Sequence, residues 1–518
     1  MAVESQVSEA QQNGAGGNGK TFAVENPATG ETIAHLPDMD AEQVKELVDR
    51  ARAAQPAWEA KSFDERARIM FRARKWMVDN RERVARTVMD ETGKTREDAF
   101  LADVFTTADA LGFWAKKAET YLKDERVHST NPFVLGKKVV VRYRPFGVAG
   151  VIGPWNYPIA NCFGDAIPAL MAGCTVVLKP SEVTPLASLL MEECMSAAGL
   201  PKDVMLVATG TGATGAALVD EVDVVMFTGS TRTGKKVAER AVQSLTPFSL
   251  EMGGKDPMIV LRDADIDRAA NEAVYWGMAN GGQICQSVER VYVEEPVHDE
   301  FVAKVVEQVK ALKQGRSDGP GSAEVGAITF GPQKDIIERH INDAVEKGAE
   351  IRCGGKAAEK GSGRWWEPTV LTNVDHSMEC MTEETFGPTL PIMKVKDDRE
   401  AVRLANDSRY GLNSSVYTRD LEKGERIARE LTAGSACVND TVVNYAAAEA
   451  PFGGTGESGM GVRHGPQGIR KYCGVQTILV TRFAMKREAY MFPYSPMKSK
   501  LVERMSVALY GRIPRRYR

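Results

Sequence analysis

The sequence has few residues placed to form cross-links or to bind metal ions. Its eight cysteines include no C-x-x-C pair, and none is spaced from the six histidines as zinc ligands are; they lie at positions 162, 174, 194, 285, 353, 380, 437 and 473. This pattern argues against a disulfide-stabilised domain and against structural zinc. It fits a reducing, cytoplasmic environment, and we expect no metal site.

Long apolar runs are missing as well. No run reaches the roughly 20 residues that a membrane-spanning helix needs. A net charge of -4 gives no reason to expect nucleic-acid binding. The first twenty residues lack the basic start and apolar core of a signal peptide, and their Gln, Asn, Gly and Ser content predicts a disordered tail. At 518 residues of ordinary globular composition, the chain should form two or three packed units.

The first third of the chain has a helical pattern, from about residue 40 to residue 120. Asp40 is placed to cap a helix running through Ala54, and Ser62 and Glu65 have the spacing of a capping box. Lys137 to Arg144 then has the pattern of an exposed strand.

From Gly147 onward, short apolar strands alternate with helices. The predicted strands are 148–152, 175–178, 204–207, 223–227 and, opening a second series that runs to about residue 450, 257–261. Strands of this kind, each followed by a helix, indicate an α/β fold with a parallel sheet covered on both faces. Ligands of such sheets bind at the carboxyl ends of the strands. We find no internal repeat.

Three residues could carry covalent chemistry. Cys285 lies between the glycine-rich Asn280–Gly282 and a strand-like run, where small neighbours leave room for a substrate. A thiolate is a strong nucleophile, although a lone cysteine is more often a small buried apolar residue. Glu251 stands beside two glycines and could act as a base, and Asn156 on a strand-end loop could donate to an oxyanion. Taken alone, Glu251 could be solvated and Asn156 an ordinary turn residue.

The cofactor signals lie at other strand ends. Gly210 to Gly215 spells G-x-G-x-x-G, but no ribose-binding acid follows at the expected distance, so we interpret it as a tight turn. Phe227 to Gly234 is a better phosphate site, since small and hydroxyl residues open a helix. Lys179 and Glu182 suit ribose hydroxyls, with a surface salt bridge as an equally good interpretation.

Together these stretches resemble the aldehyde dehydrogenase superfamily. The resemblance covers roughly Thr21 to Thr481, and it rests on G-P-W-N-Y-P, K-P-S-E, F-T-G-S-T-x-x-G, E-M-G-G-K, N-x-G-Q-x-C, E-E-T-F-G-P and P-F-G-G in the family's order. It implies a Rossmann-like parallel-sheet cofactor domain, an α/β catalytic domain and a β oligomerisation element. The expected boundaries are a tail at 1–20, an NAD-binding domain at 21–130 and 147–252, an oligomerisation element at 131–146 and 470–482, a catalytic domain at 253–469, and a basic tail at 483–518.

The resemblance also implies roles for single residues. Cys285 would attack the aldehyde, Asn156 and the Cys285 amide would hold the oxyanion, and Glu251 would activate water to hydrolyse the thioester. The cofactor contacts would be Lys179 and Glu182 at the adenine ribose, Gly229 and Ser230 at the pyrophosphate, Trp155 in the cofactor cleft, and Glu384 and Phe386 at the nicotinamide end. Glu182 favours NAD over NADP, and Glu251 favours hydrolysis over acyl transfer to coenzyme A.

The substrate is less clearly indicated. Ser287 to Val293, Arg463 to Gly468 and the long tail look like a bacterial branch named for succinate semialdehyde. However, the two positions that usually carry carboxylate-binding arginines are Ala279 and Gly164 here. We therefore expect an apolar aliphatic or aromatic aldehyde, in a tunnel lined by Tyr157, Cys162, Phe163 and Trp276 unless these are core residues. Succinate semialdehyde is the alternative. Met252 replaces the usual leucine, a volume-conserving change.

The C-terminal tail is basic, and Leu501, Val502, Met505 and Leu509 share one helical face. It could pack on another subunit, or bind an anionic membrane as a peripheral contact. Residues 139–144 and 475–480 match the family's oligomerisation element, so we expect a homodimer or homotetramer.

Two competing functions remain open. A cysteine thioesterase or esterase could use Cys285 and Glu251 without a cofactor, but the ribose and pyrophosphate motifs speak against it. A non-catalytic scaffold would be expected to lack Cys285, Glu251 or Asn156.

Overall fold

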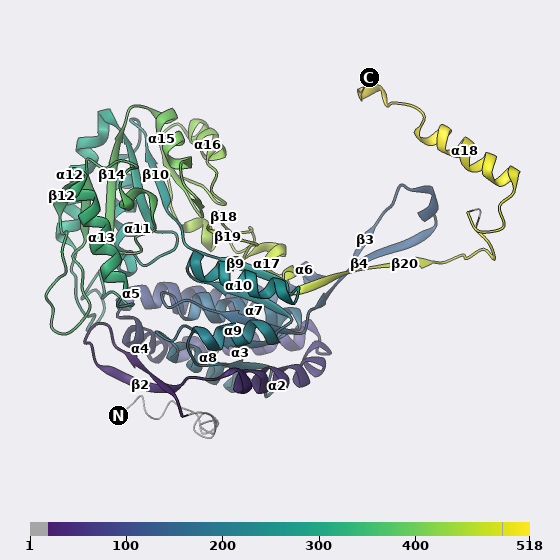
Figure 1. The fold of residues 1–518 in the computed structure, drawn as a ribbon, viewed down its shortest axis with the longest axis horizontal. Helices are drawn as coiled ribbons and strands as arrows, with labels where there is room; N and C mark the ends of the chain where they lie inside the picture. Colours follow the sequence, from purple (N-terminus) through teal and green to yellow (C-terminus); the bar gives the residue numbers. More distant parts are fainter. Residues whose placement is uncertain (1–18, 489, 518) are drawn as a thin grey trace. The chain divides into compact units, whose positions relative to one another are not determined.

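The structure, a computed structural model, describes residues 19–488 and 490–517. The predicted disordered tail at 1–20 therefore lies almost wholly outside the described residues. The chain divides into two compact units (Figure 1). The larger comprises the chain up to residue 123 and residues 143–474, and the smaller comprises 124–142 and 475–518.

Helices of the larger unit begin where the sequence predicts them. α2 (Ala41–Glu59) starts at Asp40, whose side chain accepts from the Gln43 amide, and Gln43 returns a bond to the Asp40 amide. α3 (Phe63–Asp79) has the same reciprocal box between Ser62 and Glu65. Both predicted starts are confirmed, and α2 continues past Ala54 to Glu59. α4 (Arg81–Thr92) and α6 (Thr106–Leu122) complete this helical part.

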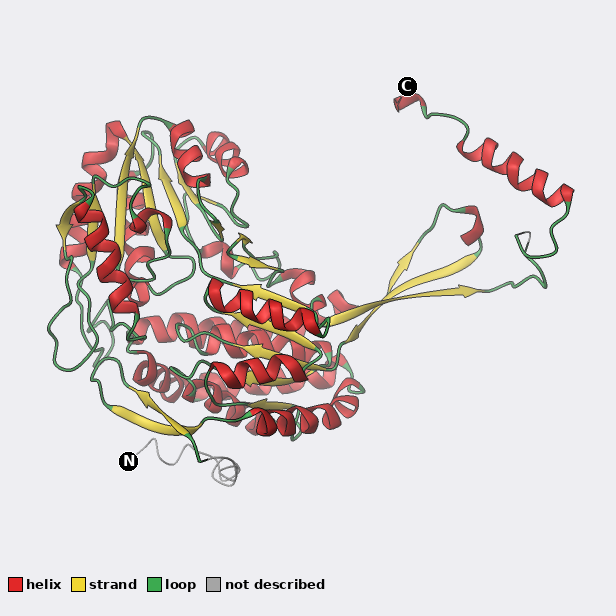
Figure 2. Ribbon diagram, in the orientation of Figure 1, coloured by secondary structure: helices red, strands yellow, loops and turns green. Residues whose placement is uncertain are grey.

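A six-stranded sheet forms the first α/β layer, in the order β19-β9-β8-β5-β6-β7. β5 to β9 are parallel, and β19 is antiparallel to β9. Helices cover it on both sides (Figure 2). The bounds are β5 (Val148–Ile152), β6 (Thr175–Lys179), β7 (Met205–Val207), β8 (Val224–Thr228), β9 (Phe248–Glu251), β19 (Gly459–Met460), α7 (Gly164–Ala172), α8 (Leu186–Ala197), α9 (Gly212–Glu221) and α10 (Thr231–Gln243).

Alternate residues of β5 explain why the strand is apolar throughout. Ala149 and Val151 belong to a core shared with α3, α6, α7 and α8, whereas Val148 and Ile152 belong to a core shared with α2, α9 and α10. A parallel sheet buried on both faces needs apolar residues at every position.

A second sheet of seven strands follows the order β12-β13-β14-β11-β10-β16-β17, with β12 antiparallel and the others parallel. Its elements are β10 (Asp256–Val260), α11 (Ile266–Met278), β11 (Val288–Glu294), α12 (Glu295–Ala311), α13 (Gln333–Glu346), β12 (Glu350–Cys353), β13 (Thr369–Thr372), α14 (Glu379–Thr382), β14 (Thr389–Val395), α15 (Asp398–Asn406), β16 (Ser415–Tyr417), α16 (Leu421–Glu430) and β17 (Cys437–Val438). The predicted α/β fold with two series of strands is confirmed.

The smaller unit contains β3 (Glu125–Val127), most of β4 (Lys137–Pro145) and of β20 (Cys473–Thr481), and α18 (Pro496–Tyr510). The three strands form one sheet, in the order β20-β4-β3. Residues of α18 are exposed along nearly its whole length. Within the described residues, we find no helix with the length and apolarity needed to cross a membrane.

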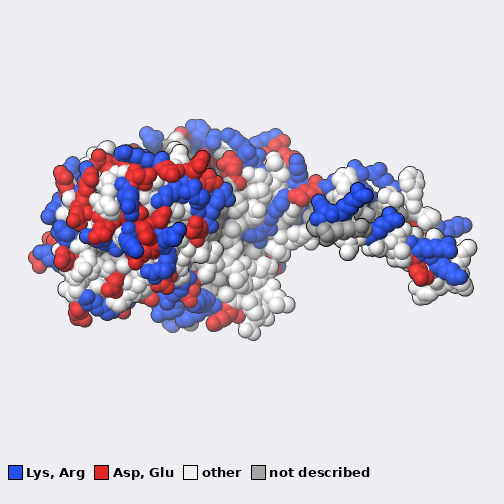
Figure 3. Space-filling model, turned by 90° about the horizontal axis from the view of Figure 1, so that it is seen from above, with Lys and Arg blue, Asp and Glu red and all other residues white. Residues whose placement is uncertain are grey.

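Charged side chains are distributed differently on the two units. Acidic and basic residues are interspersed over the face of the larger unit in Figure 3, whereas basic residues predominate on the smaller one. The predicted boundary at residue 252 between a cofactor domain and a catalytic domain stays a prediction, because the division into compact units does not separate these two parts.

Candidate active site

Cys285 lies on a short loop between a left-handed turn and β11. Asn280, Gly281 and Gly282 have positive φ values of 50, 64 and 71°. A Cβ on Gly282 would lie 2.0 Å from the Gly387 carbonyl oxygen, so only glycine allows this close approach. Asn280 and Gln283 also bond to each other's backbone carbonyls, which fixes the turn.

The Cys285 backbone packs against the segment that follows Glu251. A Cβ on Gly254 would lie 2.5 Å from the Cys285 carbonyl oxygen. The Cys285 side chain keeps some accessible surface, as does Cys353, while the other cysteines are buried. Within the described residues, no hydrogen bond uses the Cys285 backbone amide, which leaves this donor available to a bound oxyanion.

Glu251 ends β9 (Phe248–Glu251) and is buried, with 3% of its surface exposed. Its Oε1 atom has no hydrogen-bond partner among the described residues. Burial raises the pKa of Glu251 to about 7, and the charges of Arg463 and Lys471 hold it from rising further. A carboxyl that titrates near neutral pH and has an unbonded oxygen is suited to accept a proton.

The Cys285 thiol needs such a base. Dense burial raises its pKa to about 12, and the charge of Arg463 opposes this rise while those of Asp256, Glu251 and Glu384 add to it. At neutral pH the thiol is therefore protonated before a ligand binds, and a neighbouring group must take its proton. Because the charge of Glu251 acts on the thiol, these two groups are close enough to interact.

A buried ion pair, Arg463 with Asp165, lies close enough to Glu251 for its charges to act on this carboxyl. Arg463 donates to both Asp165 oxygens, at 3.1 and 2.6 Å, and also bonds to Asn161 and Thr228. Asp165 and Arg463 line a small cavity whose walls include Thr106, Ala110, Trp114, Ala160, Gly164, Tyr445, His464 and Lys471. Arg463, whose charge lowers the pKa of both Glu251 and Cys285, lines this cavity, so the cavity lies near the reacting groups.

Asn156 points at the nucleophile loop from the carboxyl end of β5. Its side chain is buried, and Nδ2 donates to the Gln283 carbonyl at 2.9 Å. Gln283 stands two residues before Cys285. The structure therefore brings Asn156, Glu251 and Cys285 together from three separate segments.

Predicted cofactor residues lie at neighbouring strand ends of the six-stranded sheet. Lys179 closes β6 and contacts Glu182 at 3.3 Å. Gly229 and Ser230 follow β8, and Ser230 caps α10 by accepting from the Thr233 amide. β5 lies between β6 and β8, so these loops flank the point where the strand order reverses, which is where dinucleotides bind in such sheets. The turn predicted at Gly210 to Gly215 is confined to its first residues: Gly210 and Thr211 lead into α9, which begins at Gly212, and Asp38 accepts from the Thr211 amide.

Trp155 and Phe386 meet edge to face, with ring centroids 5.3 Å apart. Phe386 has a φ of 51°, a conformation that needs support from its surroundings. Glu384 accepts from the Gly254 amide at 3.1 Å, and its carboxylate occupies the space where a Cβ of Gly253 would be. Burial raises the pKa of Glu384 to about 8.

Glu289 supports this loop and was missed by sequence reasoning. Its buried carboxylate receives the Thr385 and Phe386 amides, both at 2.8 Å, and pairs with Lys255 at 2.6 Å. Lys255 directly follows E-M-G-G in the sequence, which was the available signal. A pairing across 34 residues has no local pattern, so the partner could not be read from the sequence.

A second buried pair, Lys94 with Asp103, was also missed. Lys94 Nζ contacts the Asn156 carbonyl at 2.7 Å and Asp103 at 2.9 Å. The sequence signal for this pair was a lysine and an aspartate within an otherwise helical stretch, and charged residues in such a stretch usually face solvent.

For two of the four predicted tunnel residues, the structure favours the alternative that they are core residues. Cys162 and Phe163, at the end of η4 (Ile159–Phe163), are fully buried in a hydrophobic core and do not line the cavity. Tyr157 and Trp276 remain partly exposed. Two cations at other positions, Arg463 and Lys471, line the cavity, and Arg463 is occupied by Asp165.

Comparison with known proteins gives consistent matches along the chain. The sequence model of the Aldehyde dehydrogenase family matches residues 15–478. A protein of Mycobacterium ulcerans, provisionally named succinate-semialdehyde dehydrogenase [NADP(+)] 2, is 40% identical over 89% of this chain and 89% of its own. The 4,4'-diapolycopene aldehyde oxidase of a Methylomonas species is 36% identical over 92% and 88%. The crystal structure of betaine aldehyde dehydrogenase from Staphylococcus aureus with NAD+ has a TM-score of 0.86 at 32% identity, covering 92% of this chain and 95% of that one.

We predict that Glu289→Gln loosens the loop that carries Glu384 and Phe386. The Thr385 and Phe386 amides would lose a charged acceptor, worth about 1.5–3 kcal/mol per bond. Their hydrogen exchange, measured by mass spectrometry of peptides covering 383–388, should become about tenfold to a hundredfold faster.

Glu91→Gln is the matched control, because the buried Glu91 carboxyl receives the Leu186 and Ala187 amides in the same way. It should change exchange at those two residues and leave 383–388 unaffected. Unchanged exchange in the loop of Glu289→Gln would contradict the role given to Glu289.

Proposed function

The chain belongs to the aldehyde dehydrogenase family, and from this premise we propose that it oxidises an aldehyde to the carboxylic acid through a covalent intermediate on Cys285. The observation that carries the proposal is the buried carboxyl of Glu251, with one unbonded oxygen and a pKa raised to about 7 by burial, acting on the Cys285 thiol.

The protein's own residues account for the acid–base steps. Cys285 loses its proton to a base and its sulfur bonds to the aldehyde carbon, which gives a thiohemiacetal oxyanion. The Asn156 amide and the Cys285 backbone amide would donate to this oxygen, and losing one such donor typically costs about 100- to 1,000-fold in rate. Once the thiohemiacetal carbon has lost hydride, the covalent intermediate is a thioester. Glu251 then removes a proton from water, the hydroxide attacks the carbonyl, and the thiolate of Cys285 leaves.

A nicotinamide dinucleotide would supply the hydride acceptor for this reaction. The residues present fit it: Lys179 and Glu182 stand at the carboxyl end of β6, and the amides that open α10 follow Gly229 and Ser230 at the carboxyl end of β8. Trp155 and Phe386 would pack near the nicotinamide end.

We propose NAD as the preferred cofactor, because the Glu182 carboxylate would repel the 2'-phosphate of NADP. The name of the Mycobacterium ulcerans relative carries NADP(+), so both cofactors belong in every assay.

We predict that Cys285→Ala abolishes aldehyde-dependent NADH formation, followed by absorbance, because the proposed mechanism carries the acyl group on the Cys285 sulfur. Cys353→Ala is the control, since Cys353 is the other cysteine with accessible surface, and it should keep full activity. Aldehyde oxidation surviving in Cys285→Ala would contradict the mechanism. Cofactor-independent thioester hydrolysis with no aldehyde oxidation in the native chain would favour the thioesterase alternative.

The substrate we propose is an apolar aliphatic or aromatic aldehyde. Gly164 on the cavity wall and Ala279 offer no cation. The two cations that line the cavity already have partners within the protein: Arg463 bonds to Asp165, Asn161 and Thr228, and Lys471 lies 3.9 Å from Asp165. The Methylomonas relative is named for a long apolar aldehyde. Succinate semialdehyde is the second candidate, favoured by the name of the Mycobacterium ulcerans relative.

We predict higher kcat/KM for hexanal, decanal or benzaldehyde than for succinate semialdehyde. Gly164→Leu should lower kcat/KM for decanal by about tenfold or more and leave propanal little changed, because a Cβ at Gly164 meets no atom closer than 3.8 Å and the side chain would enter the cavity. Gly315→Leu is the control, since that position has open space outside the cavity. Preference for succinate semialdehyde would overturn the apolar assignment.

We further propose a homodimer or homotetramer that uses the smaller unit. In the single chain, β20 exposes Val475 and Leu479, and α18 in the tail exposes Leu501, Val502 and Leu509. The cost of leaving these side chains in water is removed when a second copy covers them. The basic residues of the tail also suit an anionic bilayer, which would be a peripheral contact of an otherwise cytoplasmic enzyme.

Truncation after Phe483 separates these two roles. We predict that it lowers the oligomer mass measured by light scattering, with no change in binding to anionic phosphatidylserine vesicles. Weaker vesicle binding with an unchanged mass would instead assign the tail to the membrane.

A further inference from the structure

We infer that Lys94 is a positioning residue that fixes the Asn156 carboxamide for catalysis, acting through a buried ion pair with Asp103. The inference rests on the proposed function, because it gives Asn156 the role of oxyanion donor.

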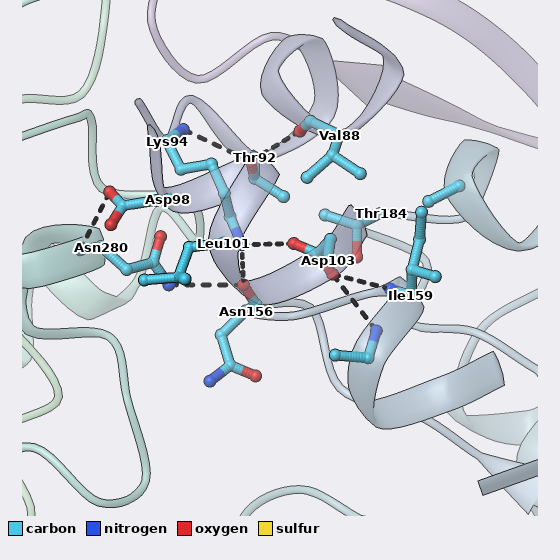
Figure 4. Close-up of polar contacts among 12 residues, drawn as sticks. Val88, Thr92, Lys94, Asp98, Leu101, Asp103, Asn156, Ile159, Thr184 and Asn280 are labelled. Atoms are coloured by element: carbon cyan, nitrogen blue, oxygen red, sulfur yellow. Dashed lines mark hydrogen bonds and ion pairs between the residues drawn. The ribbon is translucent and has the colours of Figure 1, made fainter. Parts of the chain in front are cut away.

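Lys94 is buried and makes three contacts, as many as its ammonium has hydrogens. Nζ donates to Asp103 Oδ2 at 2.9 Å and to the Asn156 carbonyl at 2.7 Å. It also lies 4.0 Å from the ring centroid of Tyr157, close enough for a cation–π contact. Figure 4 shows the Lys94 ammonium between Asp103 and the Asn156 carbonyl.

Asp103 holds the other end of the same loop. It belongs to η2 (Ala99–Phe105), a π-helix, and its Oδ1 accepts from the amides of Ile159 and Ala160 at 3.1 and 3.2 Å. These amides open η4, where no intrahelical partner exists for them. The ion pair therefore binds both ends of the segment 156–160. Lys94 binds the carbonyl of residue 156, and Asp103 binds the amides of residues 159 and 160.

The nucleophile loop completes the support. Asn280 Nδ2 donates to the Asn156 carbonyl at 3.3 Å and to the Gln283 carbonyl at 3.1 Å, and the Asn280 amide donates to Asp98. The Asn156 side chain donates to that same Gln283 carbonyl. With its backbone carbonyl held by Lys94 and Asn280, Asn156 has a fixed orientation relative to Cys285.

A contribution to folding stability does not explain why this ion pair is buried here. A buried ion pair loses much of its attraction to desolvation, and apolar replacement of such pairs is often neutral. An oxyanion donor, by contrast, needs placement within a fraction of an ångström, which is obtained from locked supporting groups.

The test is Lys94→Met/Asp103→Asn, made in the native chain and in Asn156→Ala. The double change removes both charges together, and the carboxamide introduced at position 103 retains an oxygen for the Ile159 and Ala160 amides. In the native background kcat should fall about tenfold to a hundredfold, less than the loss of about 100- to 1,000-fold when a donor is removed altogether, while KM for cofactor and aldehyde stays within about threefold. In Asn156→Ala the same change should cost less than about twofold, because the donor is already gone.

Arg262→Met/Glu294→Gln is the matched control. The buried Glu294 pairs with the half-exposed Arg262 at 2.6 Å and accepts its backbone amide, so this control also removes one cation and one buried carboxylate that receives a backbone amide. It should leave kcat unchanged in both backgrounds. If the main variant does not fold by circular dichroism, Lys94→Arg replaces it, because the guanidinium keeps the charge but displaces the Asn156 carbonyl.

Three outcomes are distinguishable. An equal loss of kcat in both backgrounds, or no loss in the native one, overturns the inference about Lys94. Full activity of Asn156→Ala alone would instead overturn the proposed role of Asn156. A loss confined to the native background supports the inference.

Discussion

The buried carboxylate of Glu289 connects the three segments on which the candidate site depends. It pairs with Lys255, four residues after Glu251, and it receives the amides of Thr385 and Phe386, next to Glu384. Glu289 itself lies at the start of β11, four residues after Cys285. One charge therefore fixes the base, the nucleophile and the predicted nicotinamide loop relative to one another. Because this charge is satisfied by three hydrogen-bonding contacts, its burial costs far less than that of an unpaired carboxylate.

The two parallel sheets supply rigid positions, and buried polar groups set the chemistry. Strand ends of the six-stranded sheet carry Asn156, Lys179 and Gly229, while β11 of the seven-stranded sheet begins just after Cys285. Burial raises the pKa of both Glu251 and Cys285, so the site holds a neutral thiol beside a half-ionised carboxyl near pH 7. The nucleophile is thus generated when a base takes its proton, and the charges of Arg463 and Lys471 oppose the rise in the pKa of Glu251.

Much of this could be predicted from the sequence because it depends on local signals. The caps at Asp40 and Ser62 and the apolar strands have short-range patterns, and the motifs around Asn156, Glu251 and Cys285 stand in a recognisable order. The supporting contacts could not be predicted. Lys255–Glu289 and the contact of Lys94 with Asn156 join residues distant in the chain, and a charged residue in isolation looks like a solvated one. For Cys162 and Phe163 the sequence left a tunnel and a core position equally open, because an apolar side chain suits both, and in the structure both are core residues.

The central claim is that Cys285 carries the acyl group and that Glu251 is needed to release it. The most direct measurement is the mass of the Cys285 peptide after Glu251→Gln is mixed with NAD and hexanal and quenched in acid. The account predicts that the peptide gains the mass of one hexanoyl group, while the native chain shows little of it. An unmodified peptide, or an adduct on another cysteine, would contradict the account.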